Sequence, residues 1–255
     1  MPLNFASLRS NITILRRCKN WQIAHKHRLS HQPLIFRKVN KLFTFLIISM
    51  VKGIFIVLDG LDGSGKSEMV KLLHNYLFSK SKKYRILTTR EPTNGTYGNE
   101  IREMLAREQD PNINGQKMLE LFIKDREEHL KSTIVPFLNK SNGHEVNIAI
   151  CDRYYYSTIA FQAAQGLDIN MLIELNKEFL SPDAAFILDV KPETALGRIS
   201  GREKEKFEKL EFMKKLRKNF LKLPKLLNDN LKVIDASKGL DGVFEDIKKE
   251  VDKLL

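Results

Sequence analysis

Short apolar runs alternate with longer amphipathic stretches through residues 51–255, and this alternation predicts a parallel sheet covered by helices. Five of the runs have strand length: Ile54–Asp59, Arg85–Thr89, Asn147–Cys151, Ala185–Val190 and Lys232–Ile234. We therefore expect an α/β protein with three layers, in which helices flank a five-stranded parallel sheet.

Apolar positions at helical spacing mark the stretches between these runs. The stripe after the first run comprises Met69, Leu73, Tyr76 and Leu77, and the last stripe comprises Val243, Phe244, Ile247, Val251 and Leu254. Pro192 and Glu193 suit the first turn of a helix over residues 192–200. Pro224 is expected to kink or end a long charged helix that starts near Phe207.

The charged residues are unevenly distributed, and the N-terminal segment is the exception. The chain has 43 Lys and Arg against 31 Asp and Glu, but residues 1–50 hold nine of the basic residues and no acidic one. The remaining 34 basic and 31 acidic residues nearly cancel, which argues against a basic surface for nucleic acid over the whole protein. We expect residues 1–49 to be a basic extension, either disordered or the product of a misassigned start, and residues 50–255 to be one domain. A targeting peptide and a tail that binds nucleic acid or a membrane surface are the alternatives.

Cysteine content and hydropathy exclude two further classes. Cys18 and Cys151 are too few for a disulfide framework or a four-thiolate zinc site. The longest apolar run, Leu42–Ile48, is far shorter than the ~18 residues that cross a bilayer. We expect a soluble cytoplasmic protein that does not enter a membrane, with organelle targeting by residues 1–49 as the alternative.

A phosphate-binding loop follows the first predicted strand. Its residues match the pattern G-x-x-x-x-G-K-[ST] and lead into a predicted helix: Gly60, Leu61, Asp62, Gly63, Ser64, Gly65, Lys66 and Ser67. Glycines let backbone N–H groups turn toward phosphate oxygens, and the helix N-terminus adds its unpaired N–H groups. We expect this loop to bind ATP or GTP, with Lys66 at the β and γ phosphates and the Ser67 hydroxyl on Mg²⁺. No Asn-Lys pair in the chain is followed by x-Asp, which disfavours a guanine-specific switch.

Charged residues at the ends of the second and third strands indicate a site for a second anion. Arg90 precedes Glu91-Pro92 and a loop with two glycines, and Asp152-Arg153 follows the third strand. Ligands of open α/β sheets bind beyond the carboxyl ends of the strands. There Asp152 could order Mg²⁺ and Arg153 could bridge two phosphates. The structural alternatives are a surface arginine at 90 and an Asp152–Arg153 ion pair that caps the next helix.

Two predicted helices carry residues suited to a planar base. Phe122, Arg126 and His129 share one helix face at i, i+4 and i+7. The second helix presents a hydroxyl, a ring and two amides at i, i+3, i+4 and i+7: Thr158, Phe161, Gln162 and Gln165. Aromatic rings could stack on a heterocycle and amides could bind its edge. Core packing is the commoner fate of a helical Phe.

Taken in order, these segments resemble the thymidylate kinase family over nearly all of residues 51–255. The matching pieces are the phosphate loop, Thr89–Pro92, Leu121-Phe122-x-x-Asp125-Arg126, Asp152-Arg153-Tyr154-x-x-Ser157 with Ala160-Phe161-Gln162, Pro182-Asp183, and a basic lid ending in Phe207-Glu208. The resemblance implies phosphoryl transfer from ATP to dTMP and a homodimer. A kinase for another nucleoside monophosphate or for a deoxynucleoside is the alternative, and an ATP-dependent nucleic-acid-binding protein is a more distant one.

The resemblance also implies roles for single residues. Asp62 would accept a hydrogen bond from the 3′-hydroxyl of dTMP. Arg153 would grip the acceptor phosphate, with Arg90 as a helper. The base and sugar would be read by residues of the two helices: Phe122 stacking on thymine, Arg126 binding its O4, Thr158 and Gln162 completing the base edge, and Phe161 crowding the 2′ position.

The lid is expected to supply a catalytic cation. Eukaryotic-type members of the family carry an arginine at the position of Gly63, whereas the other branch takes its cations from the lid. We therefore expect Arg202 to act with Lys66 and Arg153, with Arg198, Lys204 and Lys206 as alternatives. A solvated, mixed-charge helix start is the structural alternative for this segment.

Overall fold

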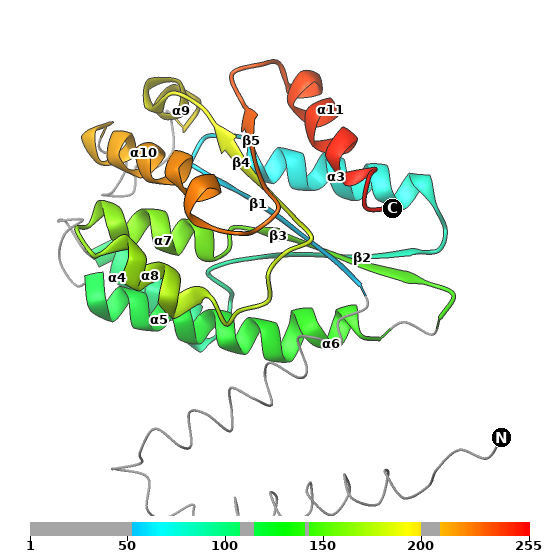
Figure 1. The fold of residues 1–255 in the computed structure, drawn as a ribbon, viewed down its shortest axis with the longest axis horizontal. Helices are drawn as coiled ribbons and strands as arrows, with labels where there is room; N and C mark the ends of the chain where they lie inside the picture. The colour runs from blue at the N-terminus through cyan, green and yellow to red at the C-terminus, as the bar shows by residue number, and fades with distance from the viewer. Residues whose placement is uncertain (1–52, 108–114, 141–142, 200–209) are drawn as a thin grey trace, which may run out of the picture. The chain divides into compact units, whose positions relative to one another are not determined.

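A computed structural model describes residues 53–107, 115–140, 143–199 and 210–255. All five predicted strands are present, with bounds that differ from the predicted ones by at most one residue. They are β1 (Ile54–Gly60), β2 (Tyr84–Arg90), β3 (Val146–Asp152), β4 (Ala184–Asp189) and β5 (Leu231–Asp235). The strands form one parallel sheet in the order β2-β3-β1-β4-β5 (Figure 1), which confirms the predicted fold class.

Helices connect the strands in the expected alternation. They are α3 (Lys66–Lys80), α4 (Thr96–Arg107), α5 (Gly115–His129), the π-helix η1 (Leu130–Ile134), α6 (Val135–Leu138), α7 (Tyr155–Ala164), α8 (Ile169–Asn176), α9 (Pro192–Ile199), α10 (Leu210–Leu226) and α11 (Leu240–Val251). The helix predicted over residues 192–200 is confirmed as α9. The helix α10 ends at Leu226, two residues after Pro224. The predicted start of that helix near Phe207 lies outside the described residues, as do residues 1–52.

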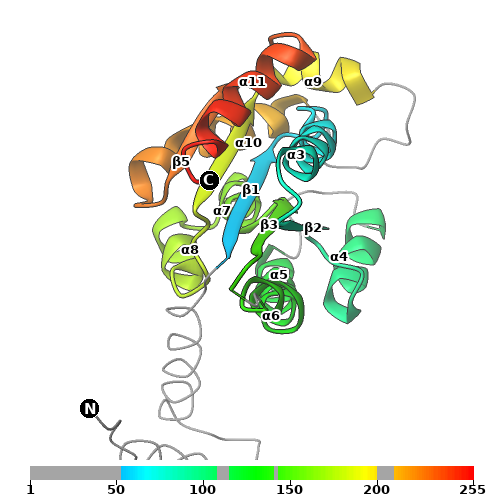
Figure 2. The same cartoon turned by 90° about the vertical axis from the view of Figure 1, so that its right-hand side faces the viewer.

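Helices cover both faces of the sheet. Figures 1 and 2 show α3 and α11 together on one face, while α7 and α10 lie on the other with α5 and α6. The strands β1, β3 and β4 read as continuous apolar runs because they are buried on both faces. The predicted stripe of α3 packs Met69, Leu73 and Leu77 into this core. None of the helices in the described part of the chain combines the length and hydropathy that a bilayer-crossing segment needs.

The topology brings the carboxyl ends of three neighbouring strands together at the same end of the sheet. β1 lies between β3 and β4, so the chain order reverses beside β1, and such a switch point forms a crevice beyond the carboxyl ends of the strands. Asp152 is in register with both Leu58 of β1 and Arg90 of β2. The phosphate loop, the Arg90-Glu91 segment and the Asp152-Arg153 segment therefore leave the sheet side by side.

Candidate active site

The phosphate loop turns sharply between β1 and α3. Three of its glycines have positive φ: 134° at Gly60, 76° at Gly63 and 97° at Gly65. A Cβ atom at Gly63 would lie 2.3 Å from the carbonyl oxygen of Ala195 in α9, so this position accepts only glycine. The loop therefore cannot carry an arginine at residue 63 unless α9 moves. Its backbone ends at the N-terminus of α3, where unpaired N–H groups favour an anion.

Lys66 lies in the centre of this loop. Its side chain is only 7% exposed, and Nζ donates to the carbonyl oxygens of Gly60 (3.2 Å) and Leu61 (2.8 Å). Burial, aided by the positive charge of Arg153, lowers the pKa of Lys66 to about 8. The ammonium group is thus held among loop carbonyls in a site that disfavours an uncompensated positive charge.

Ser67 and Asp152, the two residues predicted to hold Mg²⁺, are in direct contact. Ser67 Oγ donates to Asp152 Oδ2 at 3.0 Å. The other carboxylate oxygen, Asp152 Oδ1, is buried and has no hydrogen-bond partner among the residues that the structure describes. A hydroxyl beside a carboxylate with a spare buried oxygen suits Mg²⁺, which keeps waters and phosphates as its other ligands. The described residues hold no cluster of three or more His, Cys, Asp or Glu side chains, as a cage built wholly by the protein would require.

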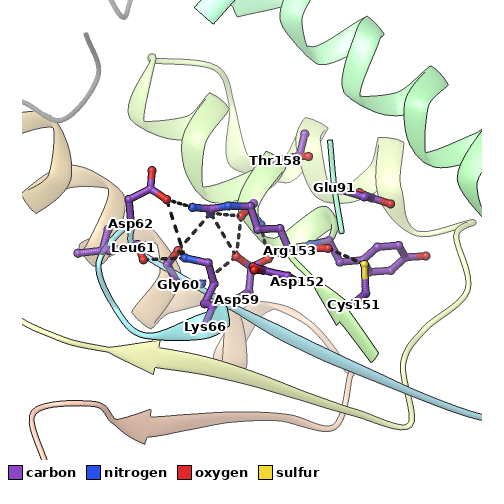
Figure 3. A network of polar contacts seen from close by, with 12 residues as sticks. Asp59, Gly60, Leu61, Asp62, Lys66, Glu91, Cys151, Asp152, Arg153 and Thr158 are labelled. Carbon is purple, nitrogen blue, oxygen red and sulfur yellow. Dashed lines mark hydrogen bonds and ion pairs between the residues drawn. The ribbon is translucent and has the colours of Figure 1, made fainter. Parts of the chain in front are cut away.

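Arg153 extends from the end of β3 across to the loop (Figure 3). Its Nη1 donates to Gly60 O at 3.2 Å and to Ser157 Oγ at 2.9 Å, and its Nη2 pairs with Asp62. The Arg153 charge holds the pKa of Asp62 at about 2. Burial opposes the charged form of Arg153, but Asp62 and Asp59 outweigh it and raise the pKa of the guanidinium. The ion pair joins the two residues predicted to bind the 3′-hydroxyl and the phosphate of the acceptor nucleotide.

Asp59 organises this region, although the sequence analysis treated it only as the end of a strand. Its fully buried carboxylate accepts from the backbone N–H groups of Gly60 (2.8 Å), Tyr154 (3.1 Å) and Ser157 (2.9 Å), and from Ser157 Oγ (2.5 Å). These bonds cap α7, a role that the sequence analysis offered to Asp152 as an alternative. Arg153 has φ 73°, the left-handed region that non-glycine residues rarely adopt. Asp59 therefore holds the turn that aims Arg153 at the loop.

Arg126, the residue predicted to read the base, is completely buried. Nη2 donates to Glu91 Oε2 (2.7 Å) and Thr158 Oγ1 (2.9 Å), and Nη1 donates to Asn176 Oδ1 (2.9 Å). Nε has no hydrogen-bond partner within the described ranges. The structure thus brings Arg126 and Thr158 together, as predicted, and adds Glu91 and Asn176, which the sequence analysis did not assign.

The other predicted base and sugar contacts lie on the same two helices. Gln162 is fully buried and its Nε2 donates to Gly115 O at 3.0 Å. Phe161 packs its ring against Phe212 with centroids 5.1 Å apart, and Phe122 is half-buried in a small apolar cluster of α4 and α5. That these three side chains contact the same bound nucleotide remains a prediction.

The remaining predicted cations differ in their surroundings. Arg90 is exposed at the end of β2 and lines a polar hollow of about 420 Å³ with Thr93, Asn94 and other residues of this edge. Arg198 in α9 donates to Ala236 O at 3.1 Å and approaches Gly63 O at 3.5 Å. Arg202, Lys204 and Lys206 lie outside the described residues, so the predicted lid is not tested.

The sequence contained signals for the residues that the analysis left unassigned. Asp59 is a lone carboxylate at the end of an otherwise apolar strand, a position where a buried charge needs partners. Glu91 and Ser157 stand inside segments already noted for their neighbours, Arg90 and Arg153. Asn176 carries no such signal, because its contact with Arg126 depends on tertiary packing.

Comparison with known proteins identifies the family. Residues 58–247 match the family model described as thymidylate kinase. A probable thymidylate kinase of Pyrococcus horikoshii is 38% identical over 204 residues, which covers 77% of this chain and 95% of the relative. A probable thymidylate kinase of Archaeoglobus fulgidus is 36% identical over 202 residues, covering 78% of this chain and 95% of that relative. A thymidylate kinase of Desulfotalea psychrophila is 36% identical over 209 residues, or 80% of this chain and 96% of the relative.

Proposed function

The chain belongs to the thymidylate kinase family, and we propose that Lys66, Ser67, Asp152 and Arg153 form its phosphoryl-transfer centre. The enzyme transfers the γ-phosphoryl group of ATP to dTMP and yields ADP and dTDP. One observation carries the assignment of the centre: Lys66 Nζ and Arg153 Nη1 both donate to Gly60 O, each at 3.2 Å. A cation from the start of α3 and a cation that follows β3 thus meet at the phosphate loop (Figure 3), where donor and acceptor phosphates have to approach each other.

The reaction needs charge neutralisation more than it needs a base. The second pKa of a phosphate monoester is about 6, so the acceptor oxygen of dTMP is already ionised at neutral pH. The obstacle is the repulsion between two polyanions held in line. Lys66 would bind the donor phosphates, and Arg153 would exchange its pair with Asp62 for the acceptor phosphate. Asp62 would then be free to accept the 3′-hydroxyl of the sugar.

We propose that Mg²⁺ accompanies ATP in this centre. Ser67 Oγ and the unpartnered Asp152 Oδ1 would hold the ion or its waters. When bound, the ion would neutralise charge on the transferring phosphoryl group.

Base recognition is proposed for the buried side chains of α5 and α7. Thymine presents an acceptor, O4, beside a donor, N3–H. Arg126 Nε–H and Gln162 Oε1 are a buried donor and a buried acceptor without hydrogen-bond partners among the described residues. Turned toward a base, these groups would complement the thymine edge, whereas cytosine carries an amino group in place of O4. Phe122 would stack on the ring, Thr158 would support Arg126, and Phe161 would crowd a 2′-hydroxyl.

A coupled assay of ADP release by the full chain tests the function. It is run with dTMP, dUMP, dCMP and thymidine at matched concentrations, and dTMP is expected to give the highest kcat/KM. A control with Lys66→Ala should lose turnover with every substrate. Faster phosphorylation of thymidine than of dTMP would instead identify a deoxynucleoside kinase.

Four expectations from the sequence remain proposals. We propose a homodimer, which light scattering of the purified protein tests, and a cytoplasmic location, which cell fractionation tests.

Arg202 is proposed as the lid cation, and Arg202→Ala is expected to lower kcat without changing the free energy of unfolding. The basic extension over residues 1–49 has no part in the proposed chemistry, and intact mass of the natively expressed protein tests where the chain starts.

A further inference from the structure

A buried carboxylate from the β2 edge of the sheet reaches the side chain that is proposed to read the base. Glu91 follows β2 directly, and its side chain is 3% exposed. Its Oε2 accepts from Arg126 Nη2 at 2.7 Å, and its Oε1 contacts His129 Nδ1 at 3.1 Å. Figure 3 shows Glu91 apart from the phosphate loop, toward the end of the site where Thr158 lies.

His129 has a defined hydrogen-bond pattern in this cluster. An ionised carboxylate only accepts, so His129 Nδ1 carries the proton that bonds to Glu91. His129 Nε2 lies 2.7 Å from Thr89 Oγ1, so a second hydrogen bond holds the other side of the ring. Both ring nitrogens are thereby used, and the ring is fixed behind Glu91. The negative charge of Glu91 remains directed at Arg126.

The segment that carries Glu91 is tied to α5 by a second carboxylate. Asp125, the neighbour of Arg126, accepts from the backbone N–H of Thr93 at 2.8 Å and from Thr93 Oγ1 at 2.6 Å. Glu91 and Arg126 therefore belong to two segments joined at two points. A change in the charge of Glu91 would act on the guanidinium without freeing the loop.

Neutral groups surround the rest of the guanidinium. Arg126 Cζ lies 5.1 Å from the ring centroid of Tyr154 and 5.4 Å from that of Phe179, and Thr158 and Asn176 supply its neutral acceptors. Glu91 is the acid that pairs with Arg126 among the described residues. Because a buried charge needs a compensating partner, Glu91 determines whether Arg126 can stay buried and ordered.

We propose that Glu91, oriented by His129, is a positioning residue that fixes Arg126 for recognition of the pyrimidine base. The inference rests on the proposed role of Arg126 and deepens it. Glu91 touches neither substrate, so its effect is on the binding of dTMP and on the preference for thymine over cytosine. The binding of ATP at the phosphate loop is expected to be independent of it.

Steady-state kinetics of the full chain tests the proposal with Glu91→Gln, a change that keeps the shape and one acceptor oxygen but removes the charge. Loss of a hydrogen bond to a charged group typically corresponds to about 10- to 100-fold in binding. We expect KM for dTMP to rise by about that factor and the dTMP/dCMP ratio of kcat/KM to fall, with KM for ATP unchanged. Glu103→Gln is the matched control, since Glu103 forms an exposed pair with Arg107 on α4, and it should leave all three quantities unchanged.

A double-mutant cycle shows whether Glu91 acts through Arg126. Arg126→Met by itself should raise KM for dTMP, and adding Glu91→Gln to it should raise KM little further. A wild-type KM in Arg126→Met would overturn the proposed role of Arg126. If Arg126→Met raises KM, then a wild-type KM and ratio in Glu91→Gln, or fully additive effects in the cycle, would overturn the positioning role alone.

Substitutions at His129 test the proposal should Glu91→Gln fold poorly. The side-chain amide of Asn can replace the Nδ1–H donor, whereas Ala cannot. His129→Ala is expected to raise KM for dTMP by about tenfold, and His129→Asn to recover most of it, which supports the proposal. Equal KM values for dTMP in the two variants would contradict it.

Discussion

Arg153 and Arg126 are both proposed to bind dTMP, yet the protein holds them in opposite ways. The Arg153 side chain is 19% exposed and pairs with Asp62, which is 54% exposed. Arg126 is fully buried and pairs with Glu91, which is nearly as buried. The first pair is in contact with solvent at the phosphate loop, and the second lies between α5, α7 and α8.

This difference separates an exchangeable cation from a fixed one. An ion pair that reaches solvent through one partner contributes less free energy than a fully buried one, so Arg153 can replace the Asp62 carboxylate by a phosphate at small cost. A buried pair is strongly destabilised when one partner is removed, so Arg126 keeps its geometry whether or not a base is present. At the phosphate end, Arg153 can thus exchange one anionic partner for another. At the base end, Arg126 keeps the same partners and the same position.

The largest expected effect is on stability at the base end. Arg126→Met leaves the Glu91 carboxylate buried without its cation and is expected to lower the free energy of unfolding by about 3–5 kcal/mol. Urea denaturation monitored by circular dichroism measures the change. The double variant Arg126→Met/Glu91→Gln should recover part of the loss. A loss below about 1 kcal/mol would show that the Arg126–Glu91 pair is not held more firmly than the Arg153–Asp62 pair.

The next largest effect is on turnover at the phosphate end. Arg153→Ala is expected to lower kcat by about 10²- to 10³-fold, or ~3–4 kcal/mol, because a cation at the transferring phosphoryl group is lost. Its effect on the free energy of unfolding should be smaller than that of Arg126→Met, measured in the same urea series. Near-normal turnover would refute the role of Arg153. Lys66→Ala should lose turnover in the same manner.

Two neighbouring hydroxyl groups of α7 allow a finer comparison. Ser157 Oγ accepts from Arg153 and Thr158 Oγ1 accepts from Arg126, each at 2.9 Å. Ser157→Ala should lower kcat by about tenfold, whereas Thr158→Val should raise KM for dTMP by about tenfold, in line with ~1.5 kcal/mol for a hydrogen bond to a charged group. Both parameters are measured for both variants. Identical effects of the two substitutions would mean that the ends of the site are not independent.

The smallest effect is the pH dependence of the exposed pair. The pKa of Asp62 is about 2 against an ordinary value of 3.8, because Arg153 favours the carboxylate. A lowered pKa stabilises the fold above the ordinary value, and this stability is lost as the pH falls through about 2. Wild type should therefore exceed Asp62→Asn by less than about 1 kcal/mol above pH 4, with the difference vanishing toward pH 2. A difference that does not shrink between pH 4 and pH 2 would contradict this account.

The fold and the residues of the phosphate end were largely accessible from sequence, whereas the buried partners of Arg126 at the base end were not. Strand bounds followed from runs such as Ile54–Asp59, since burial on both faces imposes a continuous apolar pattern. That Asp152 lies near the phosphate loop followed from the motif and from the shared carboxyl end of the parallel strands, and the structure adds its hydrogen bond with Ser67. By contrast, the burial of Arg126 depends on the packing of α5, α7 and α8, which no local pattern records.

The protein accepts the left-handed backbone of Arg153 because only an arginine there supplies the guanidinium that the loop and Asp59 both need. Glycine would relax a conformation that costs an ordinary residue roughly 1–2 kcal/mol, yet it would delete the guanidinium. The guanidinium also lies 3.8 Å from the buried Asp59 carboxylate, so its loss would leave that charge without its cation as well as stopping turnover. Engineers who wish to harden the enzyme should leave residue 153 untouched and keep Asp59, whose bonds to the start of α7 hold that turn in place.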